Sequence, residues 1–523
     1  MFTRLSTLIL AAIACAVCCS FTKVQDLTLQ QKIGQLLMVH FDGEIPNEEA
    51  KTAIQELYVG SIIYYNWANG LTSPEQVKKL SAGLQALATT PLIIAVDQEG
   101  GVVARLIQGF TVFPGNKALG MTGNAELAER SSYAMGLELL SVGVNMNLAP
   151  VVDVNINPKN PVIGIRSFGD VPESVVTFGA KSLEGYHRAG VINCLKHFPG
   201  HGDISIDSHE DLPFLYKTIE ELKRVELLPF ASLAKDADTI MTAHLLVPSL
   251  DSDYCSTLSK ITLDYLRNQI GFKGVILSDS LSMEGVVKRC GGNVDEAAIQ
   301  AFNAGCDILI LGGKQLTGAN RNLELTMADV RRIRDTLVLA VQSGRISEEA
   351  VNGSVERILQ LKQKYLSIIP TIPSEDHKAL ALTIATQALQ KIQNNPLALG
   401  SVKEKKIGVI APLLLKEMID PLLQVGKEGQ GLFFSGLSPL VDEVHSIQEQ
   451  AKKMDLLMIC SYNAWKNPAQ QTLIHALIAE GKPVLLLVVR DPLDASLFPN
   501  ANIIYTTFSP TSYAIEAVAK ELQ

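Results

Sequence analysis

Residues 191–209 read VINCLKHFPGHGDISIDSH. The apolar run from Val191 to Leu195 predicts a buried strand, and Pro199, Gly200 and Gly202 prevent a regular helix directly after it. The rest of the stretch carries three of the chain's nine histidines and two aspartates. A polar loop at the end of a buried strand is a common place for binding and catalytic groups.

Short apolar runs of this kind recur along the first two thirds of the chain. The eight strand candidates are Gly34–Phe41, Gly60–Tyr65, Pro91–Val96, Val144–Val152, Val191–Lys196, Thr239–His244, Gly274–Ser278 and Cys306–Leu311. Segments with helical spacing, such as 125–142, 173–189 and 293–304, lie between them. Eight strand-then-helix units predict a (β/α)8 TIM-type barrel. An open doubly wound sheet is the alternative, but the sequence lacks the Gly-rich nucleotide turn typical of such sheets.

A second, smaller domain follows the barrel. Residues 24–367 hold the barrel pattern, and the segment IIPTIPS that follows predicts a linker over 368–385. Over residues 386–523, five apolar runs alternate with helical segments, which predicts an αβα sandwich. These runs are Lys406–Pro412, Gly431–Ser435, Asp455–Ser461, Pro483–Val489 and Asn502–Thr507.

Residues 1–20 predict a signal peptide. Arg4 precedes an apolar stretch from Leu5 to Cys19, and polar residues resume at Ser20. One early cation and about fifteen apolar or small residues describe an export signal that is short for a membrane span. A buried N-terminal helix is the alternative, and Cys15 is a candidate lipid-anchor site. We therefore expect an exported, periplasmic or otherwise extracytoplasmic protein.

Composition excludes several kinds of partner. With 45 basic and 54 acidic residues the net charge is -9, which disfavours nucleic acid and anionic membrane surfaces. The hydrophobic fraction of 47% is ample for well-buried cores. The five cysteines beyond the first 20 residues are an odd number and lie mostly in apolar runs, which predicts buried thiols and no disulfide framework.

Most strand candidates run into reactive side chains, and barrel enzymes collect their active sites at the C-terminal ends of the strands. These side chains are Asp97 to Glu99 after the third strand, Asp153 after the fourth, Lys196 and His197 after the fifth, His244 after the sixth and Asp279 after the seventh. Carboxylates and cations together suit sugar hydroxyls, which both donate and accept hydrogen bonds. The expected ligand is therefore a small carbohydrate.

Hydrolysis of a glycosidic bond needs a nucleophile or base and an acid on the two sides of the bond. Asp279 directly follows a buried strand and is a candidate nucleophile; the alternative is that it caps the next helix. His209 has Asp207 two residues away. A nearby carboxylate orients an imidazole and raises its pKa, as a proton donor near neutral pH requires.

A zinc site is another interpretation of the histidine-rich loop. Its possible ligands are His197, His201, Asp207 and His209. Because a proline and a glycine separate His197 from His201, the two histidines cannot share a helix face in the usual way. We therefore expect no metal and no other cofactor.

Five segments of the barrel region together carry a family pattern. They are DQEGG at 97–101, NPVIGIRSFG at 160–169, KHFPGHG at 196–202 with DSH at 207–209, MTAH at 241–244 and SDSLSM at 278–283. In this order they resemble glycoside hydrolase family 3, and most closely its β-N-acetylglucosaminidase branch, the NagZ-type enzymes of peptidoglycan recycling and turnover. The resemblance covers the whole barrel. The second domain resembles the αβα sandwich of the longer members.

The resemblance implies a role for each candidate residue. Asp279 would be the nucleophile, and the Asp207–His209 dyad would be the acid and base. The residues implied to hold the terminal N-acetylglucosamine are Asp97, Arg166, Lys196 and His197. Two positions depart from the family pattern. Val102 stands where the family often has Arg, and Ser280 replaces a frequent Asp beside the nucleophile.

Together these features predict an exported, metal-independent exo-β-N-acetylglucosaminidase with a two-step retaining mechanism. Peptidoglycan fragments are the substrate that the resemblance implies; chitin oligomers, and transfer to phosphate in place of water, stay open. One alternative is a β-glucosidase-type member, in which a Glu of the second domain supplies the proton, although the DSH segment argues against it. The other is a non-catalytic cell-wall glycan-binding protein.

Overall fold

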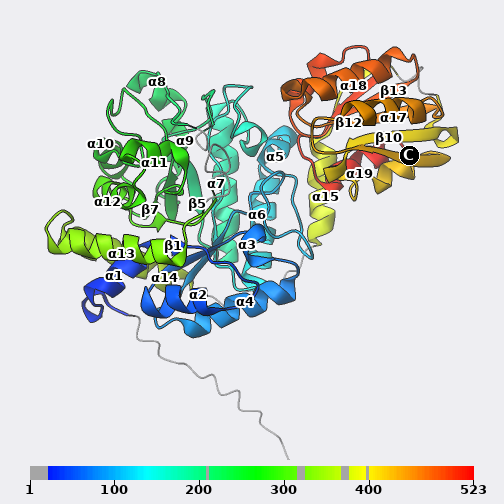
Figure 1. The fold of residues 1–523 in the computed structure, drawn as a ribbon. Helices are drawn as coiled ribbons and strands as arrows, with labels where there is room; N and C mark the ends of the chain where they lie inside the picture. The colour runs from blue at the N-terminus through cyan, green and yellow to red at the C-terminus, as the bar shows by residue number, and fades with distance from the viewer. Residues whose placement is uncertain (1–21, 208–210, 315–323, 367–375, 396–399) are drawn as a thin grey trace, which may run out of the picture.

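The computed structural model describes residues 22–207, 211–314, 324–366, 376–395 and 400–523, which form a barrel followed by a smaller sandwich (Figure 1). The predicted signal peptide and Cys15 lie outside these residues.

The first unit is a closed ring of parallel strands. Its strands are β1 (Leu37–Val39), β2 (Ser61–Tyr64), β3 (Ile93–Val96), β4 (Met146–Asn147), β5 (Cys194–Phe198), β6 (Thr239–Thr242), β7 (Val275–Leu277) and β8 (Leu309–Ile310). They pair in the orders β4-β3-β2-β1-β8 and β5-β6-β7. Parallel bridges from Met146 to Ile192 and from Leu277 to Ile308 join the two sheets on both sides. The predicted (β/α)8 barrel is therefore confirmed.

Helices cover the outside of this ring. They are α1 (Leu29–Gln35), α2 (Glu48–Lys51), α3 (Asn66–Asn69), α4 (Pro74–Leu87), α5 (Asn116–Thr122), α6 (Glu126–Ser141), α7 (Pro172–Ala189), α8 (Ile219–Arg224), α9 (Leu227–Leu233), α10 (Lys260–Asp264), α11 (Glu284–Val287), α12 (Val294–Ala304), α13 (Met327–Gln342) and α14 (Glu348–Tyr365). The barrel strands are buried along their whole length because side chains fill the inside and helices cover the outside. The strand sequences are therefore continuous apolar runs and do not alternate between apolar and polar residues.

Most barrel strands are shorter than the predicted runs; β4, for example, covers Met146–Asn147 where the run was 144–152, and the first run begins in a helix. Gly34 and Gln35 end α1 and do not begin β1. The reason is a local helix start: the Thr28 side chain accepts a hydrogen bond from the Gln31 backbone, and the Gln31 side chain accepts one from the Thr28 backbone. This capping box fixes the first turn of α1.

The second unit is a three-layer sandwich. Its strands are β9 (Gln390–Asn394), β10 (Lys406–Pro412), β11 (Glu428–Phe434), β12 (Leu456–Ser461), β13 (Val484–Val488) and β14 (Ile503–Thr506), and its helices are α16 (Asp420–Leu423), α17 (Val441–Ala451), α18 (Pro468–Ala479) and α19 (Ser512–Glu521). The sheet order is β11-β10-β12-β13-β14-β9. One face packs on α16 and α19, and the other packs on α17 and α18. The αβα prediction is confirmed.

The edge strand β9 was not among the predicted strands. It pairs antiparallel with β14, and its sequence QKIQN is largely exposed. Because an edge strand with one polar face has no continuous apolar run, the pattern used to find the other strands does not detect it.

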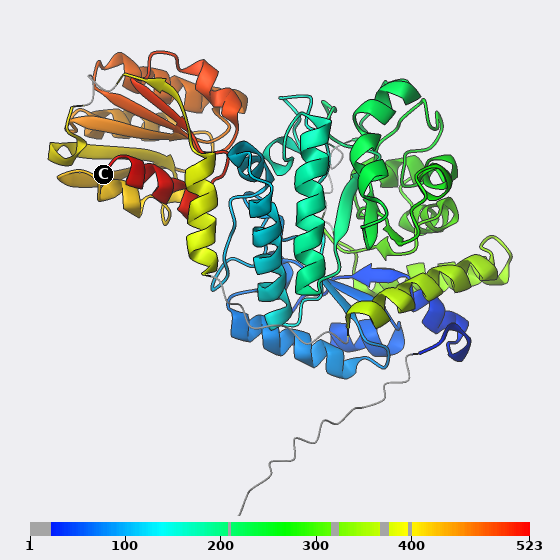
Figure 2. The ribbon, with the colours of Figure 1, turned by 180° about the vertical axis from the view of Figure 1, so that it is seen from behind.

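A helix occupies residues that the sequence assigned to the linker. α15 (His377–Ala388) begins after Asp376, whose side chain accepts hydrogen bonds from the backbone of Lys378 and Ala379. It runs between the barrel helix α5 and the sandwich helix α19 (Figure 2). Ala388 packs with Ala118 of α5 and Phe508 of the sandwich. The segment therefore joins the two units as a packed helix.

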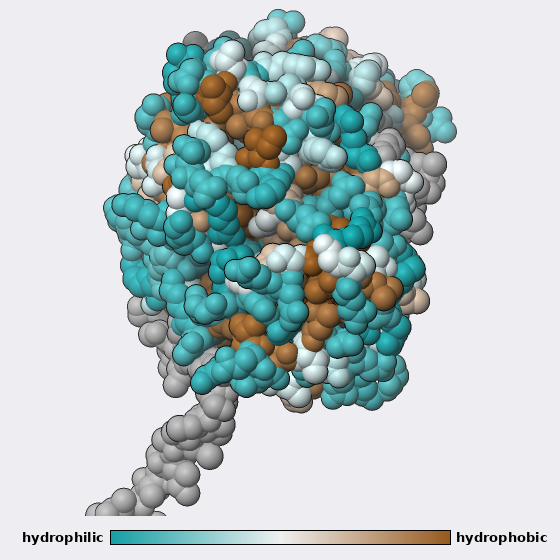
Figure 3. All heavy atoms as spheres, turned by 90° about the vertical axis from the view of Figure 1, so that its left-hand side faces the viewer, coloured by the Kyte–Doolittle hydropathy of each residue, from teal (hydrophilic) through white to brown (hydrophobic). Residues whose placement is uncertain are grey.

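The face over α10, α12 and α13 is mostly hydrophilic, with separate hydrophobic spots (Figure 3). Ion pairs link α12 to α13 and the turn after it, from Asp295 to Arg332 and from Glu296 to Arg345. Of the helices in the described ranges, none has the length and apolar character needed to cross a membrane. The cysteines of these ranges are free thiols, as predicted.

Candidate active site

A cavity of about 340 Å³ opens where the barrel strands end. Five of the seven predicted site residues line it: Asp97, Arg166, Lys196, His197 and Asp279. They follow or end β3, β4, β5 and β7, so the barrel closure brings together groups that are nearly 200 positions apart in the sequence. Charged and hydrogen-bonding groups that suit sugar hydroxyls therefore lie in this cavity among apolar and aromatic side chains.

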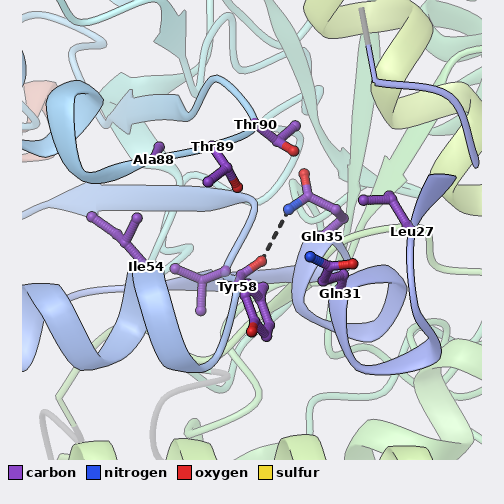
Figure 4. A pocket seen from close by; sticks show the side chains of 9 residues that line it. Leu27, Gln31, Gln35, Ile54, Tyr58, Ala88, Thr89 and Thr90 are labelled. Carbon is purple, nitrogen blue, oxygen red and sulfur yellow. Dashed lines mark hydrogen bonds between the residues drawn. The ribbon is translucent and has the colours of Figure 1, made fainter.

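The opposite end of the barrel differs. There the residues that precede β1, β2 and β3 line a pocket of about 10 Å³, room for about one water molecule (Figure 4). The Gln35 side-chain amide donates a hydrogen bond to the Tyr58 carbonyl across it at 2.9 Å. None of the predicted site residues lies in this pocket.

Glu99 organises the inner side of the active-site cavity. Its carboxylate accepts two hydrogen bonds from the Arg166 guanidinium, Nε to Oε2 and Nη2 to Oε1, each 2.9 Å long. Its Oε1 also lies 2.6 Å from Lys196 Nζ. Lys196 in turn donates to Asp97 Oδ1 at 2.8 Å. These contacts tie the ends of β3 and β5 to the loop after β4.

The groups of this cluster are held in their charged forms. Burial would raise the pKa of Glu99, but the Arg166 and Lys196 charges outweigh it and hold that pKa well below its usual range. Burial would lower the pKa of Lys196, and here the Asp97 and Glu99 charges outweigh it, so the lysine pKa is raised. The Asp97 and Glu99 carboxylates and the Lys196 and Arg166 cations therefore compensate one another's charge.

His197 is oriented by a second buried carboxylate. Its Nδ1 lies 2.7 Å from Asp153 Oδ2, and the backbone amides of His197 and His201 both donate to Asp153 Oδ1. The pKa of Asp153, which burial raises, is held low by His197 and His201. Because an ionised carboxylate only accepts, His197 Nδ1 carries the hydrogen, and Nε2 faces Arg166 Nη2 at 3.4 Å.

His201 is a neutral wall of the cavity. Burial, and to a lesser extent the neighbouring His197, lower its pKa to about 4. The loop that carries it is shaped by two glycines. Gly200 has φ +134°, and a Cβ on Gly202 would overlap the carbonyl oxygen of Val154. These constraints account for glycine at both positions of the KHFPGHG segment.

Asp279 follows β7 and is partly exposed in the cavity. Its Oδ1 accepts a hydrogen bond from the Ser280 amide at 2.7 Å. The alternative role as a helix cap is wrong, because α11 begins five residues later, at Glu284. Its position at a strand end within a polar cavity is the one expected of a nucleophile.

Of the proposed acid and base, the structure describes Asp207. His209 lies outside the described residues. Asp207 is described and half-buried, and its carbonyl accepts a hydrogen bond from the Asp211 amide at 3.1 Å. The role of the dyad stays a prediction.

The zinc interpretation gains no support from the residues that can be placed. Among them, the one group of three side chains close enough to share a metal ion is His40, Asp42 and Glu324. It contains none of the zinc-ligand candidates. Its ligand atoms already contact one another and a cation: His40 Nε2 lies 3.2 Å from Glu324 Oε2, and Lys314 Nζ lies 3.8 Å from the same oxygen.

The sequence did not identify several residues of the cavity wall. Tyr65 and Trp67 stack with ring centroids 5.0 Å apart, and Lys314 Nζ lies 3.9 Å from the centre of the Trp67 ring. Arg105 Nη2 lies 3.8 Å from Asp97 Oδ2. Arg105 thus supplies a cation near the flank where Val102 departs from the family pattern. Glu99 and Asp153 were among the strand-end side chains that the sequence analysis named, but a sequence does not reveal which side chains they contact.

A parallel barrel whose strand ends gather carboxylates, a lysine, an arginine and a histidine around one cavity is an arrangement that a glycosidase can use. Residues 28–361 match the Glycosyl hydrolase family 3 N terminal domain. The chain belongs to glycoside hydrolase family 3.

Named relatives agree with this assignment. Beta-hexosaminidase A of Pseudoalteromonas piscicida is 33% identical over 418 residues, which cover 71% of this chain and 68% of that protein. Beta-hexosaminidase of Neisseria meningitidis serogroup B is 39% identical over 274 residues, covering 50% of this chain and 74% of the relative. A solved family 3 beta-N-acetylglucosaminidase from Paenibacillus sp. str. FPU-7 has a TM-score of 0.87 and 36% identity, and covers 95% of this chain and 96% of that one.

The Glu99 cluster predicts a stability effect that depends on pH. Glu99→Gln leaves Arg166 and Lys196 buried with less negative charge, so the free energy of unfolding should fall by about 3–5 kcal/mol at pH 7. The pKa of a free glutamate, 4.5, exceeds that of folded Glu99. The stabilisation by Glu99 is therefore complete above pH 4.5 and is lost as the pH falls through the folded pKa. Denaturant unfolding between pH 3 and 7 measures both effects.

The control is Glu184→Gln, which changes an exposed partner of Lys181 and should have little effect. If the wild type and Glu99→Gln lose stability equally between pH 5 and 3, the charged state of Glu99 has been misassigned.

Proposed function

We propose that the protein is an exo-acting, retaining β-N-acetylglucosaminidase that removes terminal N-acetylglucosamine. The observation that carries the proposal is the cavity: one partly exposed carboxylate, Asp279, shares it with Asp97, Arg166, Lys196 and His197. The names of the relatives, beta-hexosaminidase and beta-N-acetylglucosaminidase, support the identity of the sugar.

The proposed reaction has two steps. In the first, Asp279 attacks the anomeric carbon and forms a covalent bond to it, while protonated His209 gives its proton to the leaving oxygen as the glycosidic bond breaks. In the second, water attacks the same carbon, His209 takes a proton from that water, and the bond to Asp279 breaks. The configuration at the anomeric carbon is retained.

The charged cluster would hold the sugar in place for these steps. Lys196 and Arg166 offer N–H donors, and Asp97 offers acceptors, to the sugar hydroxyls. Because Lys196 contacts Asp97 and Glu99 before any ligand arrives, these groups need little rearrangement on binding. The binding energy can then be used to orient the anomeric carbon toward Asp279.

Peptidoglycan fragments with a terminal N-acetylglucosamine are the proposed natural substrates. This choice rests on the family resemblance. Rates with a muropeptide fragment and with chitin oligomers, in water and in phosphate buffer, distinguish peptidoglycan from chitin and hydrolysis from phosphorolysis.

Asp279→Ala should abolish turnover of p-nitrophenyl N-acetyl-β-glucosaminide, because no other group would form the covalent intermediate. Its unfolding transition should stay near that of the wild type, since the side chain is partly exposed at a strand end. Asp170→Ala, at an exposed position outside the cavity, is the matched control and should keep the activity.

A fluorinated N-acetylglucosaminide whose covalent intermediate is hydrolysed slowly should label Asp279 in the wild type. Peptide mass analysis would identify the labelled residue. A label on another residue, or no label together with an inverted product, would contradict the two-step assignment.

His209→Ala should slow cleavage of a natural disaccharide by about 10²- to 10⁴-fold, because the basic leaving oxygen needs a proton. Release from a dinitrophenyl glycoside, whose leaving group is acidic, should slow much less. Asp207→Asn should have an intermediate effect and move the basic limb of the pH–rate profile to lower pH, since the imidazolium loses its anion.

If His209→Ala cleaves the disaccharide normally while a Glu beyond residue 375 proves indispensable, the acid comes from the second domain, as in the β-glucosidase-type alternative.

Export is a further part of the proposal and rests on residues 1–20. After expression in a bacterium, the mature protein should lack this segment and fractionate outside the cytoplasm. N-terminal mass analysis also decides whether Cys15 is acylated. Recovery of full-length protein from the cytoplasm would contradict export.

A further inference from the structure

A closed path of hydrogen bonds runs behind Asp279. It involves Thr242 and His244 at the end of β6 and Thr257 in the loop before α10. All three side chains are fully buried. The Asp279 backbone amide donates to Thr242 Oγ1 at 3.3 Å, and His244 Nε2 lies 2.8 Å from the Ser280 carbonyl oxygen. The path therefore begins and ends on the two residues that carry and follow the carboxylate.

The direction of each bond follows from its ends. A carbonyl oxygen only accepts, so His244 Nε2 carries the hydrogen and donates to Ser280. In the neutral ring Nδ1 is then an acceptor, and the Thr257 hydroxyl, 2.8 Å away, donates to it. Thr257 Oγ1 accepts in turn from the Thr242 hydroxyl, also at 2.8 Å. Every donor in the path thus has an acceptor.

Ser280 connects these hydrogen bonds to the Asp279 carboxylate. Its amide donates to Asp279 Oδ1 at 2.7 Å, while its carbonyl is held by His244 and also accepts from the Met283 amide at 3.1 Å. Fixing the Ser280 carbonyl fixes the backbone of that residue, and hence the N–H that holds one oxygen of Asp279. The rotation of the carboxylate about its side-chain bonds is limited as a result.

We propose that Thr242, Thr257 and His244 are positioning residues that hold the Asp279 carboxylate at the angle required for attack on the anomeric carbon. The inference rests on the proposed nucleophilic role of Asp279. None of the three side chains lines the cavity, so they would act through Asp279 and Ser280 and not on the sugar.

The ends of the path argue for this role over a purely structural one. Two buried hydroxyls that contact each other can be replaced by apolar groups of the same shape at little cost to folding. Thr257 Oγ1 also lies 3.1 Å from the Ala243 carbonyl, a second acceptor for the one hydroxyl hydrogen that the path gives to His244 Nδ1. Only the continuous path links Asp279 N–H to Ser280 C=O. Displacement of a reacting group by about 1 Å can cost about 10²-fold in rate.

The test interrupts the path and leaves its surroundings intact. Thr257→Val replaces the hydroxyl by a methyl group. The covalent labelling of Asp279 by the fluorinated N-acetylglucosaminide should slow by about 10- to 100-fold. The inhibition constant of free N-acetylglucosamine should stay within about twofold, because the sugar contacts Asp97, Arg166, Lys196 and His197 in the proposed site. Thr257→Ser, which restores the hydroxyl, should recover most of the labelling rate.

The matched control is Thr239→Val. Thr239 lies in β6, the strand that also carries Thr242. Thr239 is also fully buried, and its hydroxyl donates to the Asn193 carbonyl at 2.7 Å, at the end of β6 remote from Asp279. It should lower the unfolding midpoint to a similar extent without slowing labelling. If Thr257→Val does not fold, the double variant Thr242→Val/Thr257→Val, which replaces both hydroxyls, takes its place.

The outcomes separate this inference from the proposed function. Equal labelling rates for Thr257→Val and Thr239→Val, with wild-type Asp279 still labelled, would overturn the positioning role alone. A slower rate for Thr257→Val that Thr257→Ser does not restore would also overturn it, because the hydroxyl would not be the cause. Failure of wild-type Asp279 to become labelled would instead overturn the proposed nucleophile.

Discussion

The contact of Glu99 with Arg166 and Lys196 is the one on which the cavity depends. It draws three separate strand ends together; without it Arg166 would lose its carboxylate partner, and Lys196 would keep only Asp97. Asp97 joins this cluster through Lys196. The sugar-facing side of the cavity is thus a preformed electrostatic unit, while the barrel strands beneath it are held by apolar burial.

Two polar networks of different character meet in the cavity. The Glu99 cluster is ionic and belongs to β3, β5 and the loop after β4. The path behind Asp279 consists of neutral hydroxyl, imidazole and backbone groups at the ends of β6 and β7. A charged network suits sugar recognition. A neutral one constrains the backbone that carries Asp279. In the proposed reaction, the charged sector binds the sugar and the neutral sector holds the nucleophile.

The sequence predicted most of the fold because barrel strands are buried on both faces and therefore form uninterrupted apolar runs. It did not detect β9, whose exposed side chains carry no such run, and it assigned α15 to a linker because of the nearby prolines. Five predicted site residues line one cavity, since the ends of parallel strands meet at one rim. The sequence placed Glu99 and Asp153 at strand ends but did not give their roles, which come from partners 44 to 97 positions away, and it did not identify Thr257, which lies in a loop whose course the sequence does not specify. The roles of Asp207 and His209 stay predictions from the sequence.

The helix α15 connects the second domain to the helix that supports Arg166, one of the proposed sugar-binding residues. α5 begins at Asn116, whose side-chain amide donates to the Arg166 carbonyl at 2.8 Å. Two residues further on, Ala118 packs against Ala388 of α15 and Phe508 of the sandwich. The sandwich contributes none of the predicted site residues, yet it braces the helix that supports the arginine. A barrel produced alone would present this small apolar surface to water and lose the brace behind α5, so the two units are better regarded as one enzyme than as a catalytic domain with an accessory.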